Sequence, residues 1–256
     1  MTTSGTGTET GTGSQSVPGE SEAEGPPVNG WRTGSRSKVR RLPERGHYDR
    51  ESVEQILDEG FVCHVGFCTE DGPVVIPTGY ARVGDAVYLH GAPANHMLRT
   101  IGEGAAVSIV VTLVDGIVLA RSGFHHSINY RSVVVYGRGE EVTDTDEKRA
   151  ALDAVVEQIV PGRTADARGA NTSELRKTRV VRVRIDEVSA KVRTGPPKTD
   201  PEDIEAGGIW AGVLPLLVRP GEPVPDESGG DLPPVPAYVT TYRRPGTAGG
   251  TSRPTS

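Results

Sequence analysis

The chain has 256 residues, enough for one sizeable hydrophobic core with tails, and its formal net charge of −6 argues against a broad nucleic-acid-binding surface. No apolar run approaches the ~20 residues of a membrane-spanning helix, and the first residues lack the basic-then-apolar pattern of a signal peptide. We therefore predict a protein with no nucleic-acid partner and no membrane segment.

The only cysteines, Cys63 and Cys68, lie on one expected strand. They are an odd number of residues apart, so their side chains should face opposite sides of that strand and should not form a disulfide. This cysteine usage is typical of a reduced, cytoplasmic protein. Cys63 and His64 have no second ligand pair at zinc spacing, so we predict no metal site.

Composition divides the chain into a central domain and two tails. Residues 1–35 are mostly Gly, Thr, Ser, Glu and Pro, and residues 220–256 are rich in Pro, Gly, Ser and Asp, so both are predicted to be disordered. The folded domain is predicted over residues 36–219. It opens with a basic segment, residues 36–45, which we interpret as a solvated lead-in, with a nucleic-acid-binding arm as the alternative.

The first half of the domain combines short strands with two helices. Asp49 is a suitable N-cap for a helix that ends at Gly60, and Pro93 suits the first turn of a helix at residues 94–101. Turn residues of the Asp-Gly and Gly-Asp type separate three predicted strands, at residues 61–67, 74–82 and 86–90.

The second half holds longer strands. Asp115-Gly116 predicts a turn, and Thr143 or Asp144 caps an amphipathic helix that stops at Pro161-Gly162, before a short helix near Thr172. The predicted strands of this half cover residues 105–113, 117–121, 131–142 and 180–192. Successive antiparallel strands with few helices between them indicate a closed or partly closed β-barrel, so the fold class is mainly β (α+β) with a few peripheral helices.

One stretch, His125–Gly137 (HHSINYRSVVVYG), joins a polar turn to a β-run. Arg131 and Ser132 lie where the turn becomes the strand. A guanidinium and a hydroxyl on a rigid strand suit a planar, anionic ligand. The alternative is that Arg131 forms a surface salt bridge and the histidines cap a turn.

Several segments, taken together and in order, resemble the flavin-nucleotide-binding proteins of the pyridoxamine 5′-phosphate oxidase-like superfamily, in the branch that includes nitroimidazole-resistance (Nim) reductases. The resemblance covers roughly residues 42–216. It rests on the segments RGHYDRESVEQILDEG, PTGYARVGDAVYLHG, LARSGFHHSINYRSVVVYGRGEEV, EQIVPGR, SAKVRTGPPK and WAGVLPL. It implies a split β-barrel that forms a homodimer and binds FMN at the dimer interface.

The resemblance also implies which residues contact the flavin. They are Pro77, Thr78 and Gly79 along the isoalloxazine ring, Tyr130, Arg131, Ser132 and Val133 on the strand that faces the flavin, and Trp210 as a cover. A buried core position is the alternative interpretation of Trp210.

The corner after the third strand carries groups for the flavin phosphate in the family. Here Ala94, Asn95 and His96 stand where the family has Ser or Gly followed by Arg, Lys or both. The helix N-terminus still offers backbone N–H groups, so Asn95 and His96 are implied to lie near the phosphate, without a fixed cation. His90 matches a histidine that Nim-like relatives place near the flavin and is the one candidate catalytic residue, whereas a strand-end histidine bonded to backbone is the alternative.

The resemblance implies an FMN-dependent oxidoreductase acting on an unidentified small molecule, with reduction of nitro compounds as one candidate reaction. Oxidation of vitamin B6 is not expected, because the Arg- and Trp-containing C-terminal motif of the true oxidases is replaced by a Pro-rich tail. Two alternatives stay open. One is a non-catalytic flavin-binding or storage protein, since no acid, base or nucleophile pair is evident, and the other is the same fold with a deazaflavin or haem as its ligand.

Overall fold

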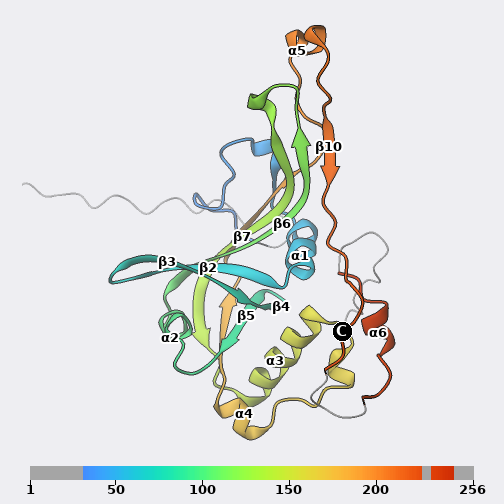
Figure 1. Cartoon of the computed structure of the whole chain (residues 1–256). Helices are drawn as coiled ribbons and strands as arrows, with labels where there is room; N and C mark the ends of the chain where they lie inside the picture. The colour runs from blue at the N-terminus through green and yellow to red at the C-terminus, as the bar shows by residue number, and fades with distance from the viewer. Residues whose placement is uncertain (1–30, 227–231, 245–256) are drawn as a thin grey trace, which may run out of the picture.

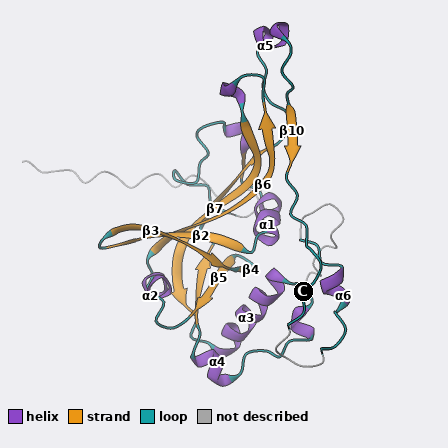
Figure 2. Ribbon diagram, viewed as in Figure 1, coloured by secondary structure: helices purple, strands orange, loops and turns teal. Residues whose placement is uncertain are grey.

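The computed structural model describes residues 31–226 and 232–244, and a long antiparallel hairpin runs through its centre (Figures 1 and 2). Its strands are β6 (Ala106–Leu119) and β7 (Ser127–Glu141). The sequence predicted a turn at Asp115-Gly116, but β6 continues through it. A register shift between Val114 and Gly116 marks a β-bulge, which absorbs Asp115 without ending the strand.

The remaining strands extend this hairpin into one sheet of order β3-β2-β6-β7-β8-β5-β4, with β9 attached to β7, β1 to β9, and β10 to β6. Every pairing within it is antiparallel, and among the described residues the two ends of the sheet do not pair with each other. This open, mainly antiparallel sheet with few helices confirms the predicted fold class. The strands are β1 (Gly46–His47), β2 (Val62–Thr69), β3 (Gly72–Gly79), β4 (Ala81–Val83), β5 (Ala86–Gly91), β8 (Arg179–Arg184), β9 (Glu187–Arg193) and β10 (Gly212–Pro215).

The split in the sheet arises on β7, which changes partner along its length. Its first part pairs with β9, from Tyr130 to Tyr136, and its last part, from Gly139 to Glu141, pairs with β8. The predicted single strand over residues 180–192 is therefore wrong, because the chain turns at Ile185-Asp186 and forms two strands. Apolar residues alternate on both sides of the turn, at 181, 183 and 185 and then at 188, 190 and 192, and only this shift by one position marks the turn in the sequence.

The helices begin where polar side chains cap them. Asp49 caps α1 (Arg50–Glu59) by accepting from the Ser52 N–H, and Asp144 caps α3 (Thr145–Ile159) in the same way through Glu147. Both helices were predicted. The other helices are α2 (His96–Gly102), α4 (Thr172–Arg176), α5 (Pro201–Ala206) and α6 (Ala237–Thr240), and the single 3₁₀ turns are η1 (Pro43–Arg45), η2 (Gly123–His125) and η3 (Arg163–Ala165). No helix in the described ranges is long and apolar enough to cross a membrane.

Helix α1 covers one face of the sheet and supplies part of the main core. Val53, Ile56 and Leu57 are buried against strand residues that include Cys63 and Val133. Burial raises the pKa of the Cys63 thiol to about 12, so this thiol stays protonated at neutral pH. Cys63 is buried and Cys68 exposed, and both are free, as their spacing predicted.

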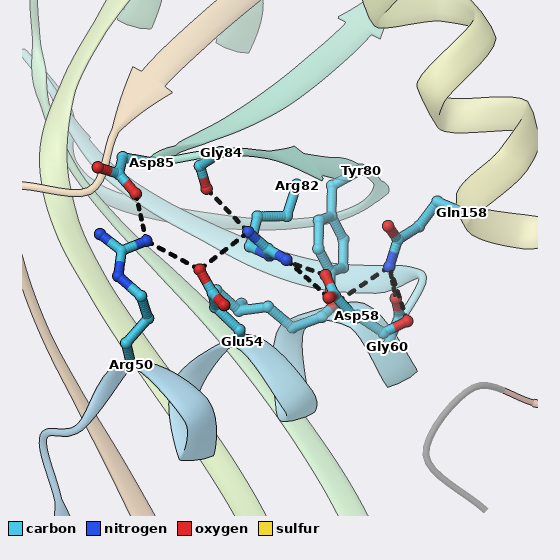
Figure 3. A network of polar contacts seen from close by, with 10 residues as sticks. Arg50, Glu54, Asp58, Gly60, Tyr80, Arg82, Gly84, Asp85 and Gln158 are labelled. Carbon is cyan, nitrogen blue, oxygen red and sulfur yellow. Dashed lines mark hydrogen bonds and ion pairs between the residues drawn. The ribbon is translucent and has the colours of Figure 1, made fainter. Parts of the chain in front are cut away.

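A polar network fixes α1 to the hairpin of β4 and β5 (Figure 3). The Arg82 guanidinium donates to Asp58 at 2.8 and 2.7 Å and to Glu54 at 3.2 Å. Arg50 donates to Glu54 at 2.9 Å and to Asp85 at 2.6 Å, which lowers the pKa of the Asp85 carboxyl. Because Arg82 is largely buried, this network positions the C-terminal end of α1 and the residues that follow it.

The N-terminal boundary of the domain lies earlier than predicted. Trp31 is buried, and the Arg50 guanidinium lies 4.4 Å from its ring centroid. The backbone of Arg32 forms an isolated parallel β-bridge with that of Glu187 on β9. Residues 31–35 therefore pack on the domain instead of belonging to a disordered tail, whereas residues 1–30 of that predicted tail lie outside the described residues.

The C-terminal boundary also needs correction. Residues 232–244 return to α1 and α3, where the Tyr242 hydroxyl donates to the Ile159 carbonyl at 2.9 Å and Arg244 Nε donates to the Glu59 carbonyl at 2.8 Å. The Tyr238 hydroxyl donates to Asp166 at 2.7 Å. Residues 232–244 therefore pack on the domain, although the sequence predicted a disordered tail from residue 220 onward. Residues 227–231 and 245–256 lie outside the described residues.

Deleting residues 232–256 is expected to lower the melting temperature without reducing flavin binding. The hydrogen bonds of Tyr238, Tyr242 and Arg244 are each worth about 0.5–1.5 kcal/mol net. At about 2–4 °C per kcal/mol for a domain of this size, the loss should amount to several degrees. Thermal unfolding of the deletion measures it, and a shorter deletion of residues 245–256 is the control. Equal melting temperatures for both deletions would show that the packed segment contributes nothing.

Candidate functional site

The sheet formed by β3, β2, β6 and β7 has one face buried under α1 and one face exposed. On β2, Cys63 is fully buried, whereas 48% of Val62 is exposed. Directly opposed residues of an antiparallel pair share a face, so the registers of these strands define the exposed side. We call this side the open face; it carries Val62, His64, Pro77, Gly79, Thr112, Val114, Ile117, Ile128, Tyr130, Ser132 and Leu214.

The open face is rich in aliphatic side chains. Val62, Val114, Ile117, Ile128 and Leu214 are all exposed. Three of them form one row across neighbouring strands, because Leu214 pairs with Ile117 and Ile117 pairs with Ile128. A monomeric soluble protein rarely exposes a contiguous apolar surface of this kind, so it indicates a surface that a ligand or another chain covers.

Hydroxyl groups lie among these aliphatic side chains. Thr112 pairs directly with Ser132, and Tyr130 pairs with Val114 one step further along the hairpin. Within the described residues, the Ser132 hydroxyl makes one long hydrogen bond, 3.4 Å, to the Lys191 carbonyl. Apolar walls with a few convergent hydroxyls suit a flat, largely apolar ring system that has polar edges.

The structure brings some of the predicted flavin residues together on this face and places others behind it. Pro77 and Gly79 lie on the open face beside His64 and Val62, and so do Tyr130 and Ser132 on β7. Thr78 has the same orientation as Cys63, toward the other side of the sheet. Val133 is fully buried in the core, so only its backbone can border a ligand.

Arg131 also points toward the buried face, where two carboxylates hold it. Its Nε and Nη2 atoms donate to Asp115 at 2.9 and 2.8 Å, and Nη2 donates to Glu59 at 3.0 Å. A further bond joins Nη1 to Glu59, and both carboxylates raise the pKa of Arg131. Only 5% of the Glu59 side chain is exposed. These contacts support the alternative interpretation of Arg131 as an ion-pair residue, in a largely buried position instead of at the surface.

His90, Asn95 and His96 lie at the corner between β5 and α2. Strand β5 pairs with β4 and β8, not with the strands of the open face. The side-chain oxygen of Asn95 accepts from the Leu98 N–H at 3.1 Å and so caps α2, while His96 is exposed. His90 Nδ1 is buried with no hydrogen-bond partner among the described residues, and burial lowers the pKa of His90. The ring is therefore neutral at pH 7.

Trp210 does not occupy a core position, because 69% of it is exposed. It lies between α5 and β10, and its ring approaches Gly212, where an added Cβ would lie 2.8 Å from the ring. Its predicted role as a cover over the flavin stays a prediction. The buried tryptophan of this chain is Trp31.

Sequence reasoning missed Val62, Thr112 and Val114 on the open face. Their signal was the alternation along residues 62–68 and 106–114, where exposed residues occupy every second position. The predicted central stretch placed Arg131 and Ser132 together, but strand alternation sends their side chains to opposite faces.

The tip of the β6–β7 hairpin brings both neighbouring histidines into defined contacts. His126 Nδ1 lies 2.9 Å from the Ser122 carbonyl, and His125 Nε2 lies 2.9 Å from Asp200, just before α5. Phe124, beside them, is 90% exposed. Figure 1 shows α5 at the same end of the molecule as this tip. Within the described residues, no group of three or more His, Cys, Asp or Glu side chains could hold a metal ion.

Comparison with known families and structures gives clear matches. The family model for pyridoxamine 5′-phosphate oxidase matches residues 49–192. The structure of the flavocytochrome Anf3 from Azotobacter vinelandii is 36% identical, with 82% of this chain and 97% of that chain covered and a TM-score of 0.75. The structure of the FAD and haem binding protein from Mycobacterium smegmatis is 37% identical, with 77% and 96% covered and a TM-score of 0.73. A comparison with curated proteins found no match.

Proposed function

This chain belongs to the pyridoxamine 5′-phosphate oxidase family, and we propose that it is a redox protein that binds a flavin on the open face and haem as a second cofactor. The observation that carries the proposal is the open face itself, an apolar surface with hydroxyls at its centre. The flavin, when bound, supplies the redox chemistry, and the protein binds and orients it.

The two structural relatives support the pairing of flavin with haem. The name of one contains both flavin and cytochrome, and the name of the other states FAD and haem. This chain matches 97% and 96% of their lengths at more than a third identity. Haem is thus proposed together with a flavin, instead of in its place. Mass spectrometry of the released nucleotide distinguishes FMN, which the sequence suggested, from FAD.

The residues that would hold the flavin ring come from β2, β6 and β7. Val62 and Val114 offer apolar contact, and the hydroxyls of Thr112, Tyr130 and Ser132 offer hydrogen bonds to polar ring edges. Because Arg131 is bonded to carboxylates behind the sheet, we assign it to positioning β7 and not to contacting the ligand.

We propose that a second copy of the chain covers the open face, so that the flavin lies between two subunits. The exposed aliphatic residues of β2, β6 and β10 support this proposal, because burying them stabilises a dimer by roughly 25 cal/mol per Å² of apolar surface. An obligate interface is expected to bury about 2,000 Å² or more.

Replacing Val114 with arginine is expected to lower both dimer formation and flavin binding. The charged side chain would have to be desolvated in the middle of the open face, at a cost of several kcal/mol. Light scattering and flavin content measure the two effects. Val83→Arg is the matched control, because Val83 is 47% exposed and Val114 45%, but Val83 lies on β4, away from the open face. Normal dimers with full flavin content in Val114→Arg would place the site elsewhere.

We propose oxidoreduction of a small molecule as the reaction, with nitro compounds among the candidate substrates. Burial lowers the pKa of His90, so its ring stays neutral at pH 7, and its position on β5 does not join it to the open face. A non-catalytic flavin carrier is the second candidate, supported by the lack of a hydrogen-bonded acid–base or nucleophile–base pair among the described residues of the open face. An assay of the oxidation of a reduced nicotinamide, with a nitro compound as the electron acceptor, distinguishes the enzyme from the carrier, because only the enzyme would turn over.

We also propose a cytoplasmic location, which the free thiols of Cys63 and Cys68 support.

A further inference from the structure

The chain has six histidines, and all of them lie in the described residues: His47, His64, His90, His96, His125 and His126. A histidine binds a haem iron through an unprotonated ring nitrogen, and its other nitrogen usually donates a hydrogen bond that fixes the tautomer and the ring orientation. We therefore compared the ring contacts of the six side chains.

His126 has the contacts that this role requires. Its Nδ1 lies 2.9 Å from the Ser122 carbonyl oxygen, which can only accept, so Nδ1 is the protonated nitrogen. The lone pair is then on Nε2, for which the structure shows no protein partner among the described residues, and His126 is exposed.

The other histidines fit less well. His125 directs Nε2 to the Asp200 carboxylate at 2.9 Å, and its side chain is mostly buried, so it braces the hairpin tip against the segment before α5. His90 Nδ1 is buried and has no hydrogen-bond partner among the described residues, so no contact fixes its tautomer. His47 is half-buried on β1, and His64 and His96 are exposed. For these three histidines the structure shows no hydrogen bond that would fix the ring among the described residues.

The surface next to His126 suits the apolar part of a porphyrin. His126 is extended, with φ −58° and ψ 142°, and it precedes β7 by one residue. Strand alternation places its side chain on the same side as Ile128. Ile128 pairs with Ile117, and Ile117 pairs with Leu214, so an exposed apolar row begins beside the imidazole.

A cation for the haem propionates lies on the same tip. Arg121 precedes η2 and donates to the Thr199 hydroxyl at 3.3 Å. No carboxylate pairs with Arg121 within residues 31–226 and 232–244. Guanidinium groups bind carboxylates through paired N–H donors, so Arg121 is a suitable group for a propionate on this part of the hairpin.

We propose that His126 is the axial haem ligand of this protein, through Nε2, with its ring held by the Ser122 carbonyl. This inference rests on the proposed function, since it takes haem as one of the two cofactors. It assigns haem to the far end of the open face and leaves the flavin on the part around Thr112 and Ser132.

The test is haem titration of the full-length protein and of His126→Ala, followed by the Soret band, with His47→Ala, on β1, as the histidine control. Losing an outer-shell partner of a metal ligand typically costs 10–100-fold in affinity, so losing the ligand itself should weaken haem binding by more than about tenfold. Flavin content should be unchanged. Added imidazole should restore the wild-type Soret position in His126→Ala, which a general loss of folding would not allow.

Two results would overturn the assignment, and they differ in what they say about the proposed function. If His126→Ala binds haem with the affinity and the Soret position of the wild type, the ligand is another residue and haem remains a cofactor. If the wild-type protein binds flavin but no haem, the assignment fails together with the haem part of the proposed function.

Discussion

Arg131→Ala is expected to destabilise the fold by about 3–5 kcal/mol, because it leaves the buried Glu59 carboxylate without its cation. Arg131 joins three elements: it lies on β7, Glu59 ends α1, and Asp115 is the bulged residue of β6. Chemical denaturation measures the loss as a lower midpoint with an unchanged slope.

Ser132→Ala is the matched control for this change. Ser132 is the next residue on β7, faces the open side, and makes only a 3.4 Å hydrogen bond to backbone. Its free energy of unfolding should change by less than about 1 kcal/mol. In flavin titrations the order should reverse, with Ser132→Ala weakening flavin binding more than Arg131→Ala does in its folded fraction. If Arg131→Ala were stable but bound flavin poorly, Arg131 would have to contact the flavin, and the structural role assigned to it would be wrong.

Gln158→Met is expected to cost about 2–4 kcal/mol of folding stability, since an unsatisfied buried polar group costs about 1–3 kcal/mol. Gln158 is almost fully buried on α3, and its amide nitrogen contacts the carbonyls of Leu57, Asp58 and Gly60 at 2.9, 3.1 and 2.5 Å (Figure 3). In the variant, the Leu57 carbonyl would still accept a hydrogen bond from the Tyr80 hydroxyl, at 2.6 Å. The carbonyls of Asp58 and Gly60 would therefore be the ones that lose a donor.

Methionine keeps the length of the glutamine side chain and removes its donor, so the variant tests hydrogen bonding more than packing. Ala150→Met, at an exposed position of the same helix, is the control and should change stability by less than about 0.5 kcal/mol. If the two variants unfold at the same denaturant concentration, the three carbonyls do not depend on Gln158.

The sequence predicts the local elements well where one residue type decides them. Asp49 and Asp144 cap their helices as expected, because a carboxylate just before an amphipathic segment can accept a hydrogen bond from the free backbone N–H groups of the first turn. The Asp115 bulge was not predictable, since Asp-Gly serves a turn and a bulge equally well. The hairpin at Ile185-Asp186 was hidden because apolar residues alternate on both sides of it.

The candidate site was only partly predictable for a related reason. Residues 133–135 are all valine, so alternation in the sequence does not say which side of β7 is buried, and Arg131 could be assigned to either face. The structure settles the side through Glu59, which α1 brings from far along the chain. Contacts between distant segments, such as that of Arg244 with Glu59, have no local sequence signature.

The central claim is that this protein binds a flavin and haem together, and the absorption spectrum of the purified protein tests it most directly. After reconstitution with both cofactors and removal of the unbound fraction, we expect flavin bands and a Soret band in one protein peak, with about one flavin per chain. Val114→Arg should lose the flavin bands, and His126→Ala should lose the wild-type Soret band. A wild-type protein that lacks either cofactor after reconstitution would contradict this claim.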